Sequence, residues 1–124
     1  MYFLDPLPPW RIPAVLRSVR AVVIPEHSFG VAIHQSQIPF EAIACGVTPL
    51  VSNEAAAKYK HIKEYIKTVD PLDSESFATM LKQALSESWN QRLLEDSSKI
   101  RNSLGDYCKY VGSVESVLFE LASQ

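Results

Sequence analysis

Residues 38–53 read Ile38-Pro-Phe-Glu-Ala-Ile-Ala-Cys-Gly46 and then Val47-Thr-Pro-Leu-Val-Ser-Asn53, and this stretch decides the predicted fold. Apolar residues at helical spacing, a proline suited to a first helical position and a glycine suited to a left-handed ending predict a short helix over 38–46. The apolar and β-branched run from Thr48 to Ser52 predicts a buried strand. A helix that leads directly into a strand is half of a β-α-β unit.

Three other apolar runs predict further strands. Ala21 to Ile24 is stopped by Pro25, and Ile66 to Val69 is followed by Asp70. Continuous apolar runs are typical of parallel strands that are covered on both faces. Tyr2 to Asp5 predicts another strand, which leads into a proline-rich turn.

Helical spacing predicts helices over 12–19, 54–65, 74–87, 89–104 and 107–122, with Asp73 or Ser74 as an N-cap and a hinge near Gly105 and Asp106. Strands that alternate with helices predict the α/β class, as a three-layer α-β-α, Rossmann-like parallel sheet of about four strands with C-terminal helices. We expect residues 1–88 to form this sheet domain and residues 89–124 to pack on it within one compact unit.

Composition limits the classes of protein to which the chain can belong. Its 124 residues, 47% of them hydrophobic, suffice for one core. A formal charge of −2 without a run of Lys or Arg lacks the electrostatic footprint of a nucleic-acid-binding protein. No long apolar stretch and no secretory signal are present, so we expect a cytoplasmic protein without an integral membrane segment.

The cysteines and tryptophans suggest structural roles. Cys45 and Cys108 lie far apart without a CxxC pair, so we interpret both as reduced, buried thiols, with Cys45 as a small core residue. Trp10 and Trp89 fit packing positions in the core or between helices. No metal is expected, because the histidines show no metal-ligand spacing: His27, His34 and His61.

The loop from Pro25 to Ile38 carries most of the candidate chemistry. Ligands of parallel sheets bind at the carboxyl ends of the strands, and this loop is longer than the two to six residues usual for such a link. Its side chains could bind sugar hydroxyls, and backbone N–H groups at the start of the next helix could meet a phosphate. A solvated surface loop is the alternative. The polar residues are Glu26, His27, Ser28, His34, Gln35, Ser36 and Gln37.

Glu41 places a carboxylate in the first turn of the predicted helix over 38–46. The helix dipole stabilises such a carboxylate by about 0.3 to 1 kcal/mol, so no ligand is needed to explain it. A structural role and a ribose-binding role are both open from position alone.

Several of these segments together resemble a known family. Pro25 after an apolar strand, Phe29-Gly30, Phe40-Glu-Ala-Ile-Ala-Cys-Gly46 and Thr48-Pro-Leu-Val-Ser52 are similar to the C-terminal, nucleotide-sugar-binding domain of GT-B fold glycosyltransferases of the retaining group 1, or family 4-like, type. The segments 12–25 and 69–81 extend the likeness, which spans roughly residues 3–85 and covers the later part of that domain.

The resemblance implies a role for Glu41, which matches the second glutamate of the family's Glu-x7-Glu motif and would bind the ribose hydroxyls of the nucleotide. The loop just before it, Ser36 to Phe40, would face the donor's diphosphate and sugar with its backbone groups, as the family's Gly-Phe-Gly loop does. The donor implied is a UDP- or GDP-sugar, with no other cofactor. The remaining donor-binding residues by this resemblance are Phe29, Gly30, Ser36, Gln37, Ile38, Pro39 and Phe40.

The first glutamate of the motif is where this sequence departs from the family. Counting back from Glu41 gives Ile33, whereas alignment on Phe29-Gly30 gives His27. Glu26 adjoins His27 and could substitute, so the candidate catalytic residues are Glu26 and His27. The resemblance also leaves out the family's acceptor domain and two earlier β-α units, which predicts a fragment or a reduced protein. In a full-length enzyme the location could be peripheral to a membrane.

Two functions follow as expectations. The first is a part of a glycosyltransferase that supplies some of the donor-nucleotide site, is inactive alone and has the missing acceptor domain as its partner. The second is a non-catalytic glycosyltransferase-like module that acts in protein association, for example as a homodimer, because an incomplete sheet exposes its edges. An unrelated flavodoxin-like binding domain is disfavoured, since no glycine-rich phosphate loop is present.

Overall fold

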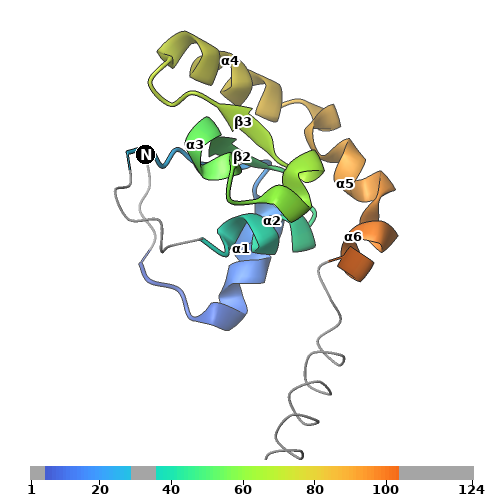
Figure 1. Cartoon of the computed structure of the whole chain (residues 1–124). Coiled ribbons are helices and arrows are strands. Elements are labelled where there is room, and N and C mark those ends of the chain that lie inside the picture. Colours follow the sequence, from blue (N-terminus) through green and yellow to red (C-terminus); the bar gives the residue numbers. More distant parts are fainter. Residues whose placement is uncertain (1–4, 29–35, 104–124) are drawn as a thin grey trace, which may run out of the picture.

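The structure is a computed structural model that describes residues 5–28 and 36–103 (Figure 1). Most of the strand predicted over 2–5 and the helix predicted over 107–122 lie outside these residues, as does the predicted hinge. Part of the candidate loop, residues 25–38, and one cysteine also lie outside the described residues: Phe29, Gly30, Ile33, His34, Gln35 and Cys108.

A parallel sheet of three strands forms the centre of the described part of the chain. The strands are β1 (Val22–Ile24), β2 (Pro49–Ser52) and β3 (Lys67–Val69), in the order β1-β2-β3. Val23 pairs with Leu50 across the first ladder, and Ser52 pairs with Val69 across the second. The prediction of an α/β protein with a parallel sheet is confirmed.

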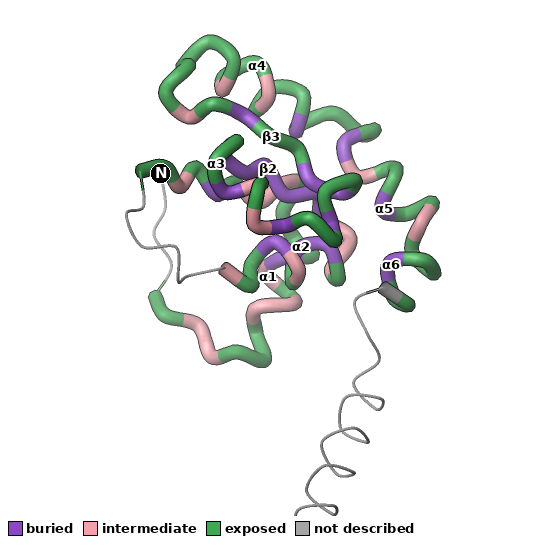
Figure 2. Tube along the Cα trace, viewed as in Figure 1, coloured by how far each residue is buried: buried purple, intermediate pink, exposed green. Residues whose placement is uncertain are grey.

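The strand β2 is buried along its whole length because apolar groups cover it on both faces (Figure 2). Val51 belongs to a cluster that α2 (Ile38–Ala44), α3 (Asn53–Ala56) and the elements around them complete. Leu50 belongs to a second cluster, which α4 (Ser74–Ala84) covers. Successive residues of a strand point to opposite faces, so the two clusters lie on opposite sides of the sheet.

Local signals explain where α2 ends and where α4 begins. Gly46 has a φ of 80°, the left-handed conformation that ends α2 at little cost for a residue without a Cβ. Asp73 caps α4 because its Oδ1 accepts a 3.0 Å hydrogen bond from Ser76 N. The helix α1 (Ile12–Ser18) also agrees with the predicted helical spacing.

Two predicted helices are broken in the structure, and the predictions of continuous helix are therefore wrong. Residues 54–65 divide into the end of α3 and a 3-10 helix, η2 (Lys60–Tyr65). Tyr59, Ile62 and Tyr65 are all buried and recur every three residues, a period that aligns side chains in a 3-10 helix. Residues 89–103 divide into η3 (Glu87–Asn90), α5 (Gln91–Glu95) and α6 (Ser97–Ser103).

Asn90 explains the break at the end of η3, because its side chain joins the starts of two strands. Its Oδ1 accepts a 2.8 Å hydrogen bond from Thr48 N, and its Nδ2 donates a 2.9 Å bond to Arg20 O. Next to it, Trp89 Nε1 donates to Thr48 O at 3.1 Å, and Thr48 Oγ1 donates to Trp89 O at 3.2 Å. These four bonds attach η3 to the amino ends of β1 and β2.

Two packing predictions need correction. Trp10, in η1 (Pro9–Arg11), is 78% exposed, because η1 projects beyond the core. Cys45 is a free thiol but only half-buried, since it lies at the end of α2 beside a surface hollow. Trp89 is buried, as predicted. Among the residues that the structure describes, no helix has the length and apolar character needed to cross a membrane.

We predict that Asn90→Ala lowers the free energy of unfolding by about 1 to 3 kcal/mol, because a partly buried backbone N–H loses its acceptor. Urea unfolding measures the change. Asn102→Ala, at an exposed position of α6, is the matched control and is expected to stay within about 0.5 kcal/mol of the parent. Equal losses in the two variants would contradict the role assigned to Asn90.

Candidate functional site

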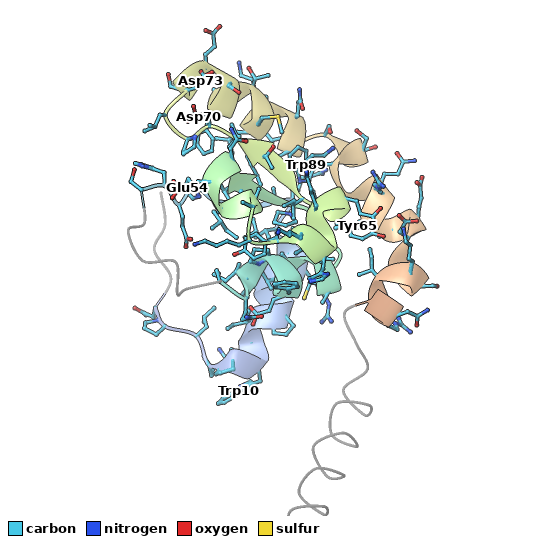
Figure 3. All side chains as sticks on the ribbon, in the orientation of Figure 1. Trp10, Glu54, Tyr65, Asp70, Asp73 and Trp89 are labelled. Atoms are coloured by element: carbon cyan, nitrogen blue, oxygen red, sulfur yellow. The ribbon has the colours of Figure 1, made fainter. Side chains whose placement is uncertain are left out.

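The carboxyl ends of the three strands meet at one edge of the sheet. Ile24 pairs with Val51 and Ser52 pairs with Val69, so the segments that follow β1, β2 and β3 leave the sheet side by side. Figure 3 shows Glu54, Asp70 and Asp73 on this side of the sheet and Trp89 and Tyr65 away from it. This edge is the position at which parallel sheets bind ligands.

Ser52 joins the segments after β1 and β2. It is fully buried, its hydroxyl donates to the backbone O of Glu26, and the same oxygen accepts a 3.0 Å bond from Ala55 N. The second bond caps α3, because Ser52 is its N-cap residue. A single hydroxyl thus fixes the start of the candidate loop against the start of a helix.

Ser28 is held by a second contact between the same two segments. Its backbone N–H donates a 2.9 Å hydrogen bond to Glu54 Oε2, and its φ of 57° is in the left-handed region. His27 Nδ1 lies 3.2 Å from Ser28 Oγ, so the histidine ring is next to this turn and exposed. The Glu54 carboxylate therefore stabilises a backbone conformation that costs a non-glycine residue energy.

Tyr59 anchors the other end of the candidate loop. The ring is 1% exposed, its hydroxyl donates a 3.1 Å bond to Ser36 O, and Phe40 packs edge-on at 5.7 Å between ring centroids. Burial, followed by the negative charge of Glu26, raises the pKa of Tyr59 above its usual value of 10.0. Glu26 itself is half-buried.

The start of α2 offers fewer backbone donors than the sequence predicts. Ile38 N donates to Ser36 Oγ at 3.3 Å, and Pro39 has no N–H. The Pro39 side chain is fully buried and Phe40 is half-buried against Tyr59, so these two residues pack, whereas Gln37 and Ile38 are exposed. The predicted phosphate contacts of this segment have little free backbone to use.

Glu41 lies on the side of α2 that faces α1. It is exposed and borders a hollow of about 300 Å³ between the two helices, and no ion pair joins it to another described residue. Across the hollow are a cation, Arg17, and a mainly apolar wall. The residues of that wall are Pro9, Ile12, Pro13 and Leu16, whereas Ala44 and Cys45 line the hollow from the side of α2.

The predicted site residues therefore fall into two groups. Glu26 and His27 lie at one end of the candidate loop and Ser36 at the other, where Ser52, Glu54 and Tyr59 bond the backbone of these ends. Glu41 belongs to the hollow beside α1. The supports were missed by sequence reasoning, although Ser52 carries a usable signal, since a serine that ends an apolar run is a good N-cap.

Charge at the carboxyl edge is mainly negative. Glu26, Glu54, Asp70 and Asp73 all follow strand ends. Three of them already accept backbone hydrogen bonds, since Glu54 accepts from Ser28 N, Asp70 Oδ1 accepts from Leu72 N at 2.9 Å and Asp73 caps α4. Carboxylates accept hydrogen bonds from hydroxyls and repel phosphate. In the part of the chain that the structure describes, no three metal-binding side chains gather. The edge suits a hydroxyl-rich ligand.

A second hollow of about 300 Å³ lies at the opposite, amino end of the sheet. Its lining includes Thr48 and Lys67 from the strand starts, with Trp89 and Arg92 from η3 and α5. Arg92 is already paired with Glu64 at 3.0 Å. This hollow lacks every residue that the sequence indicates for ligand binding.

Comparison of the chain with protein-family models, with curated proteins and with solved structures gives no match.

We predict that Tyr59→Phe lowers the free energy of unfolding by about 0.5 to 1.5 kcal/mol at neutral pH, because the bond to Ser36 O is lost. Since its pKa is raised by folding, Tyr59 ionises first in the unfolded state as the pH rises above about 10, which destabilises only the parent protein. The difference between parent and variant should therefore narrow above that pH. Urea unfolding at pH 7 and above pH 10 measures it, and a constant difference would contradict the environment described for Tyr59.

Proposed function

We propose that this chain supplies the ribose-binding part of a nucleotide-sugar site in a glycosyltransferase of the GT-B type. The observation that carries the proposal is Glu41, an exposed carboxylate beside a hollow that is apolar on its far wall. A carboxylate accepts two hydrogen bonds, as the neighbouring hydroxyls of a ribose require. Ile12 and Pro13 offer an apolar surface for the flat base.

Ser28 supports the same proposal from the loop. By the resemblance to the family, Ser28 stands where the Gly-Phe-Gly loop has its first glycine, and its φ of 57° is one that glycine adopts readily. The left-handed conformation of Ser28 is what we would expect at such a glycine position. Glu26 and His27 precede it, and we assign them to the transferred sugar.

The negative charge of the carboxyl edge indicates which parts of the donor this chain would bind and which parts the rest of the enzyme would bind. Four carboxylates follow the strand ends, three of them bonded to backbone N–H groups, and their negative charge repels a diphosphate. Cations for the diphosphate would come from the two β-α units and the acceptor domain that the family resemblance implies. The chain alone would then bind a donor weakly and transfer no sugar.

We also propose the finer fold, a four-stranded, three-layer Rossmann-like sheet. In the described residues, β1 has a neighbour on one side only, and Val23 is 36% exposed on it. The apolar run of residues 2–5 precedes α1 and β1, so a parallel strand there would complete another β-α-β unit beside β1.

Association of two chains is the second candidate function, and the same open edge of β1 favours it. A homodimer would pair this edge between copies instead of with residues 2–5. Deletion of residues 1–4 distinguishes the two, with molar mass measured by light scattering. A monomer that loses stability on deletion supports the four-stranded sheet, whereas a dimer that survives it supports association.

We predict that UDP- or GDP-sugars raise the melting temperature of the chain through Glu41. A ligand at 100 times its Kd stabilises by about 2.7 kcal/mol, or roughly 10 °C for a domain of this size. Glu41→Gln should weaken binding by about ten- to hundredfold, because hydrogen bonds to a charged acceptor contribute about 1.5 to 3 kcal/mol.

Glu75→Gln is the matched control, since Glu75 is also an exposed carboxylate in the first turn of a helix, α4. It should bind nucleotide as the parent does. The proposal fails if no nucleotide changes the melting temperature, and the placement of the ribose fails if both variants bind equally well.

A further inference from the structure

We infer that the outer face of η1 and α1 is a docking surface for a membrane with anionic lipid headgroups. This basic aromatic face consists of Trp10, Arg11, Ala14, Arg17 and Ser18, all of which are exposed. Residues 10, 14 and 17 are spaced as i, i+4 and i+7, so they share one side of the helix, and 11 and 18 lie next to them.

Trp10 is the first observation behind this inference. It is the most exposed of the large apolar side chains in the described residues, at 78%, and Figure 3 shows it pointing away from the body of the protein. Pro8 and Pro9 precede it and restrict the backbone that carries it. Tryptophan prefers the boundary between water and lipid, where its ring is buried and its N–H stays hydrated.

The charge around Trp10 is the second observation. Residues 6–25 contain Arg11, Arg17 and Arg20 and no acidic residue, although the whole chain has a formal charge of −2. The nearest carboxylates along the chain are Asp5 and Glu26. Arg17 borders the same hollow as Glu41, and no ion pair joins these two residues. Two of these arginines, Arg11 and Arg17, belong to the basic aromatic face, and none of the residues that make up this face is acidic.

An anionic lipid surface fits this combination better than other acidic partners. An exposed tryptophan beside arginines on one helical surface is the pattern of segments that lie in the membrane interface. A nucleic acid would favour a longer stripe of cations than this face provides. Each arginine near an anionic surface strengthens binding by about fivefold, so the two arginines and one tryptophan of this face give a weak, reversible association.

The test uses flotation of the whole chain with phosphatidylcholine vesicles that do or do not contain phosphatidylglycerol. We expect binding only to the anionic vesicles, with loss of binding in 0.5 M NaCl, because salt screens exposed charges over a few ångströms. Brominated lipid should quench the emission of Trp10, which is exposed, more than that of the buried Trp89.

Arg11→Glu changes the local charge by two and should weaken vesicle binding about 25-fold, whereas Trp10→Ser should weaken it without changing its salt dependence. Lys63→Glu, an equal charge change at an exposed position of η2, is the control and should alter binding less than twofold. Trp10 and Arg11 do not line the hollow of Glu41, so nucleotide binding is expected to persist in both variants.

Equal binding to both kinds of vesicle overturns the inference, as does an equal effect of Lys63→Glu and Arg11→Glu. Tighter binding to polyglutamate or to duplex DNA than to anionic vesicles at the same salt concentration overturns it in favour of another acidic partner. If Arg11→Glu does not fold, the salt titration and lipid quenching of the parent protein decide the question alone.

Discussion

The complete burial of β2 is the constraint on which the rest of the structure depends. Its four residues contact apolar clusters on both faces, so every polar group at its ends must be bonded within the protein. At the amino end, Thr48 is bonded by Asn90 and Trp89. At the carboxyl end, the hydroxyl of Ser52 bonds the loop after β1 and the first turn of α3. A strand of four residues thereby fixes three segments that lie far apart in the sequence.

The two ends of β2 differ in what surrounds them. The amino end is occupied by structural bonds, and its neighbouring hollow is bordered by the ion pair of Arg92 with Glu64. Near the carboxyl end, Glu54 accepts a hydrogen bond from the backbone N–H of Ser28, at the start of the candidate loop. Tyr59 donates a hydrogen bond to the backbone O of Ser36, at the end of that loop. The supports of the candidate site are therefore buried or bonded, whereas His27, Glu41 and Arg17 remain exposed for contact with a ligand or a surface.

Sequence patterns predicted the parts of this fold that local physics determines. Apolar runs located β1, β2 and β3, and Gly46 and Asp73 marked the ends of their helices. The breaks at residues 57–59 and 96 escaped prediction, because spacing by three and by four are hard to distinguish within one turn. The contacts of Ser52, Glu54 and Tyr59 join residues 23 to 26 positions apart, and the exposure of Trp10 depends on where η1 ends relative to the core. A short window of sequence predicts neither these long-range contacts nor the exposure of Trp10.

The central claim is that a nucleotide binds beside α2 at the carboxyl side of the sheet, and backbone amide chemical shifts test it most directly. The claim predicts that titration of the ¹⁵N-labelled chain with UDP or GDP moves the amide signals of Ser28, Ile38 and Glu41, together with Arg17 across the hollow. Signals of Thr48, Lys67 and Trp89 at the amino end should stay in place. Shifts confined to that amino end, or no shifts with either nucleotide, would contradict the account.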